Sequence, residues 1–208
     1  MFSSKTAASL SALLLLLSLT ACAVGEESDA PSTGTGASAG LGADAGAILA
    51  EFEITAPETV TDLIEQLQAQ PLADRPDGLM ASVRVDELLL TSGDNEVSVA
   101  LPDEKFHLSV APYLTETHEC FYHSLTTCVG ELGAEDLHVT ITDDANGEVL
   151  VDRDVTTNDN GFFDVWLPAG LDITMHIDDG GNTVELPLGT REDDATCVTT
   201  AQLSPREP

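Results

Sequence analysis

Residues 137–168 read LHVTITDDANGEVLVDRDVTTNDNGFFDVWLP, and this stretch predicts most of the fold. Apolar and polar residues alternate in LHVTIT, which is the period of a strand with one buried face. DDANG and NDNG supply the Asn-Gly steps that tight hairpins need. The strand-like segments DITMHI and TVEL follow, with DDGG between them. Short strands at such a spacing predict an antiparallel β-sandwich.

A small helix-plus-strand region is expected before the sandwich. Residues 55–58 resemble a capping box with an early proline, and we predict a helix from there to about Gln70. Its apolar residues at helical spacing are Val60, Leu63, Ile64 and Leu67. Alternating runs over 82–85, 87–90, 96–101 and 106–111 predict strands. The predicted fold class is therefore α+β: a small N-terminal α+β region over residues 48–112, packed with or joined to a β-rich domain over residues 113–208.

The first 21 residues have the features of a lipoprotein signal peptide. Lys5 precedes the apolar run 13–17, and Leu-Thr-Ala-Cys at 19–22 matches the bacterial lipobox, in which the cysteine is lipidated and becomes the mature N-terminus. Ordinary export with Cys22 uninvolved is the alternative. Each buried methylene contributes about 0.8 kcal/mol, so lipid chains on Cys22 would hold the protein to the outer face of the cell membrane. Residues 22–47, rich in small and polar residues, predict a flexible tether.

The charge is strongly acidic. The full chain has a net charge of −30, and removal of residues 1–21 takes away Lys5 and no acid, leaving 6 basic and 37 acidic residues and a net charge of −31. Such a surface repels nucleic acid, so a nucleic-acid function is excluded. The acids are spread along the chain and favour a solvated surface. The turns DDANGE and TNDNG lack the full loop of a calcium site and favour hairpins.

Three thiols remain after lipidation: Cys120, Cys128 and Cys197. In an extracytoplasmic protein an odd number leaves at least one thiol free or paired with another molecule. One reading is a Cys120–Cys128 disulfide with Cys197 as a buried apolar residue, in a surface domain that binds a protein or wall component without metal. The other is a copper(I) site of three thiolates, because copper(I) prefers soft sulfur ligands. Zinc is a less favoured occupant, since the Cys-x7-Cys spacing lacks the short knuckle of structural zinc sites.

Histidines close to the first cysteine extend the candidate ligand set. His118 and His123 flank Cys120, and on an extended chain His118 shares the face of Cys120 while His123 does so only if the chain turns. His107, His138 and His176 fall on predicted strands and are expected to be core or surface residues, and Met175 is expected to be core packing. We find no sequence signature of a hydrolase or of phosphate-transfer chemistry, so the chain is not expected to be an enzyme.

The segment APYLTETHECFYHSLTTCVGEL and the later DATCVTTAQL resemble the CueP family of copper-binding envelope proteins. The resemblance extends over about residues 52–203 and includes LMASVRVDELLL and DNGFFDVWLP. It implies that Cys120, Cys128 and Cys197 bind copper. His118 and His123 fall inside the resembling stretch and are candidates to assist as ligands. It also implies an N-terminal domain similar to the dimerisation domains of periplasmic disulfide isomerases, and thus a homodimer. The lipobox departs from enterobacterial relatives, which are soluble in the periplasm.

The function expected from the residues and the resemblance is copper(I) sequestration and resistance at the cell envelope. The thiols must be reduced to bind copper, so a thiol reductant is an expected partner. Thiol-dependent reduction of copper(II) is the one redox step that the ligand set suggests. Delivery of copper to an envelope cuproenzyme is implied by the resemblance alone.

Overall fold

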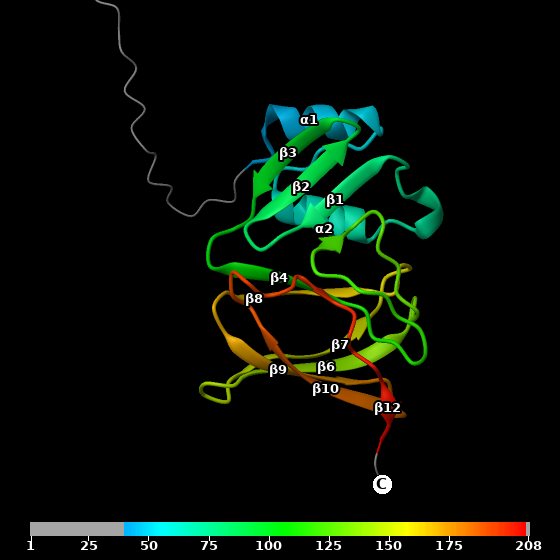
Figure 1. The fold of residues 1–208 in the computed structure, drawn as a ribbon, viewed down its shortest axis with the longest axis vertical. Helices are drawn as coiled ribbons and strands as arrows, with labels where there is room; N and C mark the ends of the chain where they lie inside the picture. Colours follow the sequence, from blue (N-terminus) through cyan, green and yellow to red (C-terminus); the bar gives the residue numbers. More distant parts are fainter. Residues whose placement is uncertain (1–39, 207–208) are drawn as a thin grey trace, which may run out of the picture. The chain divides into compact units, whose positions relative to one another are not determined.

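A computed structural model describes residues 40–206, and Figure 1 traces their elements. The signal peptide, Cys22 and the tether up to residue 39 lie outside the described residues. The helices are α1 (Gly42–Glu51), α2 (Val60–Gln68) and the 3-10 turn η1 (Leu72–Asp74). The strands are β1 (Leu79–Val83), β2 (Glu87–Ser92), β3 (Asn95–Ala100), β4 (Lys105–Val110), β5 (His123–Ser124), β6 (Asp136–Asp143), β7 (Val149–Thr156), β8 (Phe163–Pro168), β9 (Asp172–Asp178), β10 (Asn182–Gly189), β11 (Cys197–Val198) and β12 (Ser204–Pro205). The described chain is mostly β-sheet with two short α-helices, consistent with the expected sandwich.

The two helices and a four-stranded sheet form the first core. The sheet has the order β3-β2-β1-β5, and Figure 1 shows α1 and α2 beside it. Helix α2 buries the apolar stripe read from the sequence, and α1 adds Ala45, Ile48 and Leu49 to the same cluster. Burial of an aliphatic side chain contributes about 1.5–3 kcal/mol, so this packing stabilises helices too short to persist alone.

Two details of this region differ from the sequence expectation. Helix α1 begins at Gly42, so residues 42–47, expected to be tether, are helical. The composition of the segment is small and polar, but Ala45 and Leu49 are fully buried against the first core, which offsets the ordering entropy. The N-cap of α2 is Thr59 rather than Thr55, because the Thr59 hydroxyl accepts from the Asp62 backbone N–H at 3.1 Å.

Two sheets enclose the second core. One has the order β12-β10-β9-β6-β7 and the other the order β11-β4-β8. Inward residues of β6 and β9 alternate with outward ones as the sequence predicted: Leu137, Val139, Ile141, Ile173, Met175 and Ile177 are buried. Met175 is core packing, as expected. The pairing is antiparallel with one exception in this pair of sheets, because β11 runs parallel to β4.

The three-stranded sheet β11-β4-β8 lies between the two cores. Its Phe163, Val165 and Leu167 belong to the second core, whereas Trp166 packs against the first. Every residue of β4 after Lys105 is buried, since both faces are covered. Strand β4 falls inside the region 48–112 that we predicted as N-terminal, yet it pairs with β8 of the later sequence. This shared sheet positions the candidate site.

The remaining histidines and the acidic turns have structural surroundings. His107 is buried on β4, His138 is exposed beside Asp152 and Asp154, and His176 is half-buried on β9. In the DDANG turn the Asp143 carboxylate accepts from Ala145 N at 2.8 Å and from Asn146 Nδ2 at 2.9 Å. These hydrogen bonds make an Asx-stabilised hairpin, in agreement with the turn interpretation.

Candidate metal centre

The three thiols converge at one end of the shared sheet. Ala111 follows β4, Phe162 precedes β8 and Cys197 lies on β11, and these three buried residues form a small apolar cluster. Cys120 and Cys128 pack against it from the long connection between β4 and β6. Cys197 reaches this place because β11 pairs with β4, which sets Cys197 opposite Ser109. Residues 77 positions apart in the sequence therefore meet through a short parallel pairing.

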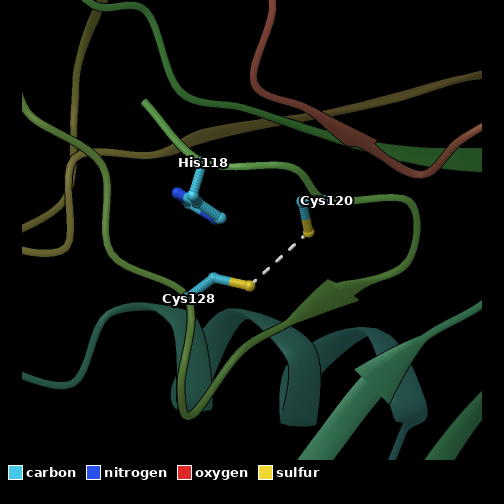
Figure 2. A group of neighbouring side chains, drawn as sticks. All are labelled: His118, Cys120 and Cys128. Carbon is cyan, nitrogen blue, oxygen red and sulfur yellow. Dashed lines mark hydrogen bonds between the residues drawn. The ribbon is translucent and has the colours of Figure 1, made fainter. Parts of the chain in front are cut away.

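The structure pairs Cys120 with Cys197 in a disulfide and leaves Cys128 as the free cysteine of these three. The Cys120–Cys128 disulfide considered from sequence is therefore not the pairing found. The Cys120–Cys197 pairing results from the register of β11 on β4, and the spacing of Cys120 and Cys128 in the sequence gives no information about that register. Figure 2 shows Cys128 Sγ directed at Cys120 Sγ, and the two sulfurs are 3.7 Å apart. Cys197 is 2% exposed, whereas Cys120 and Cys128 are half-buried.

His123 lies on the buried side of the thiols. It forms the short strand β5, which pairs with β1 so that His123 faces Val83, and its ring is fully buried against Phe162 with 4.4 Å between ring centroids. His123 Nδ1 is 3.7 Å from Cys197 Sγ. From the sequence, we expected His123 to lie on the same side as Cys120 only if the chain turns between them, and the chain does turn there. Burial is the main cause that lowers the pKa of His123 well below its ordinary value, and the charge of Arg75 acts in the same direction, so the imidazole of His123 is neutral.

His118 lies on the exposed side. Figure 2 places it beside Cys120 and Cys128, and its ring centroid is 6.4 Å from that of Phe162. Two candidate ligand groups result: His118, Cys120 and Cys128, and then His123, Cys128 and Cys197. Cys128 is common to both groups. The structure therefore brings together all five residues that the sequence suggested, with one histidine on each side of the sulfurs.

The free thiol sits in a mixed electrostatic environment. Burial raises the pKa of Cys128, while the hydrogen bond from Ser124 N at 3.4 Å and the charge of Arg75 act in the opposite direction. Arg75 also donates from Nη1 to the Cys128 carbonyl at 2.8 Å, which ties the loop to the segment before β1. The net effect is a raised pKa, so Arg75 only partly offsets the burial that favours the neutral thiol over the metal-binding thiolate.

The donor set fits a soft metal ion once the thiols are reduced. Within each candidate group the ligand atoms lie within 4.8 Å of one another. Metal–sulfur and metal–nitrogen bonds of about 2.3 and 2.0 Å allow separations of up to roughly 4.5 Å around one ion. Small side-chain movements would therefore close either group. Thiolate with neutral imidazole is the set that copper(I) prefers, and zinc accepts it too.

Sequence reasoning missed two residues that shape the site. The ring of Phe162 is next to the rings of both His118 and His123. Gln68, at the end of α2, has its Oε1 3.0 Å from His123 Nε2. The sequence did hold a sign of this role, because Gln68 is a polar residue on the apolar stripe of α2, whereas the other polar residues of this helix lie outside the stripe. A glutamine buried in such a stripe needs a polar partner.

Comparison with known proteins agrees with this geometry. A family model described as "Periplasmic copper-binding protein CueP" matches residues 62–202, which include all three thiols and both histidines. The chain belongs to the CueP family. The resemblance stated from sequence is confirmed. A crystal structure of the protein designated S.CueP matches with a TM-score of 0.70 and 34% sequence identity, covering 76% of this chain and 96% of that one. Among curated proteins, none matches. Within residues 40–206, no helix of this CueP protein is long and apolar enough to cross a membrane.

Proposed function

We propose that this CueP protein sequesters copper(I) at the cell envelope through the thiolates of Cys120, Cys128 and Cys197. The observation that carries the proposal is the convergence of three sulfurs and two imidazoles at one end of the shared sheet. His123 is the inner assisting ligand, since it is buried and neutral beside Cys197, and His118 is the outer one. Cys22 lipidation would hold the site at the outer face of the cell membrane.

Copper loading depends on the redox state of the thiols. With Cys120 bonded to Cys197, only Cys128 offers a thiolate, so the disulfide form binds copper(I) weakly and a thiol reductant prepares the site. Copper(II) is the oxidant in a separate step that returns the thiols to the disulfide. Two copper(II) ions each take one electron from the Cys120 and Cys197 thiols, which lose two protons and form the disulfide, and two copper(I) ions result. Because the disulfide form binds copper(I) weakly, copper(I) formed in this way leaves the site and is available to a cuproenzyme.

An anaerobic titration tests the proposal. The mature chain, residues 22–208 with Cys22→Ser, is reduced and titrated with copper(I) against a chromophoric competitor. We expect one copper(I) per chain, and affinity lower by at least about tenfold in each of Cys120→Ser, Cys128→Ser and Cys197→Ser. His176→Ala is the control, because His176 lies on β9 and belongs to neither ligand group. Failure of the unsubstituted chain to compete for copper(I) would contradict the proposal.

Two further additions to the same samples separate the alternatives. Zinc added in equal amount should not displace copper(I). Copper(II) added to reduced protein should give copper(I) with the loss of two thiols per two ions, and unchanged copper(II) would exclude the redox step. If the chain binds neither metal, the alternative of a disulfide-containing surface domain that binds a protein or wall component is favoured.

A further inference from the structure

Gln68 is a buried amide at the point where α2 meets the candidate site. It is the last residue of α2, it is 3% exposed, and it lies on the apolar stripe beside Ile64. Burying an amide without partners is unfavourable, and a leucine would continue the stripe without that cost. Only the Oε1 end of the amide has hydrogen-bond partners, and Nε2 has none within residues 40–206, so the position of the amide is explained by the contacts of Oε1 rather than by packing.

The orientation of the Gln68 amide follows from a backbone group. Phe162 N donates to Asn160 Oδ1 at 3.1 Å, and a backbone N–H can only donate, so the Asn160 amide is fixed with its nitrogen turned the other way. Asn160 Nδ2 then donates to Gln68 at 3.4 Å, which identifies the receiving Gln68 atom as Oε1. The same Oε1 is 3.0 Å from His123 Nε2.

The tautomer of His123 follows in turn. An amide oxygen only accepts, so a hydrogen bond to it requires that His123 Nε2 carries the proton. A neutral imidazole has one N–H, which leaves Nδ1 with a free lone pair. That nitrogen is the one 3.7 Å from Cys197 Sγ. With the opposite tautomer, an N–H would face the sulfurs and Nδ1 could not bind a metal.

We propose that Gln68 is a positioning residue that holds His123 in the Nε2–H tautomer, so that Nδ1 is available to copper(I) beside Cys197. The inference rests on the proposed function and deepens it by assigning one ligand atom and its supporting residue. Residues that accept the second N–H of a metal-binding histidine typically change metal affinity by 10–100-fold when they are replaced. Gln68 would therefore link α2 of the first core to the metal centre.

The first test needs no copper. We would record nitrogen-15 NMR spectra of the histidine rings in the reduced, metal-free chain with Cys22→Ser, with His123→Ala used for assignment. The expected result is a protonated Nε2 and an unprotonated Nδ1 in His123. A protonated Nδ1 would overturn the inference, whatever the protein does with copper.

The second test measures how Gln68 and His123 act together. In the copper(I) competition titration, Gln68→Leu should lower affinity by about 10–100-fold, and Gln66→Leu, on the exposed face of the same helix, should leave it unchanged. In a His123→Ala background, Gln68→Leu should have no further effect, because its action passes through His123. Equal losses in both backgrounds, or no loss in either, would contradict the assignment. A chain that binds no copper(I) at all would instead contradict the proposed function.

Discussion

Asp164 shows how a single residue near the site responds to its surroundings. It lies on β8, on the face of the shared sheet that is turned toward α2, and it accepts a hydrogen bond from Ser109 Oγ at 2.5 Å. Its carboxyl is largely withdrawn from water, and His107 Nε2 is 3.7 Å away. Burial raises the pKa of Asp164 to about 6, although the hydrogen bond from Ser109 offsets part of that effect.

The raised pKa of Asp164 predicts a defined dependence of stability on pH. The folded chain keeps the Asp164 proton to higher pH than the unfolded chain does. The contribution of Asp164 to the free energy of unfolding therefore falls as pH rises from about 4 to about 6. Asp164→Asn still accepts from Ser109 and does not titrate. We expect the variant to match the original near pH 4 and to exceed its free energy of unfolding by up to about 3 kcal/mol above pH 6.

Urea unfolding at several pH values measures this difference. Burial also lowers the pKa of His107 to about 3, but this residue is present in both proteins, and the comparison isolates Asp164. A difference between the two proteins that stays constant from pH 4 to pH 7.5 would show that Asp164 does not titrate in this range.

At the scale of the elements, the loop that carries Cys128 is held in place by a direct backbone contact with the turn before β8. The contact is between Gly130 and Gly161, neither of which has a side chain. A Cβ on Gly161 would lie 2.7 Å from the Gly130 carbonyl carbon, and Gly161 has φ +79°. Gly130 is two residues from Cys128, and its N–H donates to Asn160 O at 2.7 Å. The close approach of the two backbones therefore ties the cysteine loop to the turn before β8.

Gly161→Ala should destabilise the protein for two reasons. The left-handed backbone costs an alanine about 1–2 kcal/mol, and the clash with Gly130 adds about 1–3 kcal/mol. Gly170→Ala is the matched control, because Gly170 has φ +86° but no atom within 4 Å of its added Cβ. Urea unfolding of the reduced chains should show a clearly larger loss for Gly161→Ala. Equal losses would mean that the loop contact does not constrain the fold.

The elements also show what the sequence could and could not predict. Alternation and Asn-Gly turns located the strands from 137 to 189, because those signals act locally along the chain. The pairing of Cys197 with Cys120 was not predictable, since it depends on a two-residue parallel contact between β11 and β4. The start of α1 was missed because its small residues gain stability only by burial against a distant sheet. The contact of Gln68 with His123 was not predictable, because the sequence does not show which segment of the chain packs against the end of α2.

For the whole molecule, the acidic surface and the membrane have to be reconciled. The mature chain, with 6 basic and 37 acidic residues and a net charge of −31, is repelled by anionic lipid, so attachment to a membrane would require the predicted lipid on Cys22. In a bacterium that processes lipoproteins, we expect the protein in the membrane fraction even after a high-salt wash, and Cys22→Ser in the soluble fraction. Mass spectrometry of the N-terminal peptide should show a diacylglyceryl cysteine. An unmodified Cys22 in membrane-bound protein would contradict the anchor.

If the proposed function is correct, one copper(I) ion is bound by the sulfur atoms of Cys120, Cys128 and Cys197. X-ray absorption at the copper edge of the reduced, copper(I)-loaded chain with Cys22→Ser reads the ligands directly. We predict a shell dominated by sulfur, with one scatterer replaced by a lighter atom in Cys197→Ser and no change in His176→Ala. A shell of only nitrogen and oxygen, or a sulfur shell unaltered by Cys197→Ser, would contradict copper(I) binding by the three thiolates.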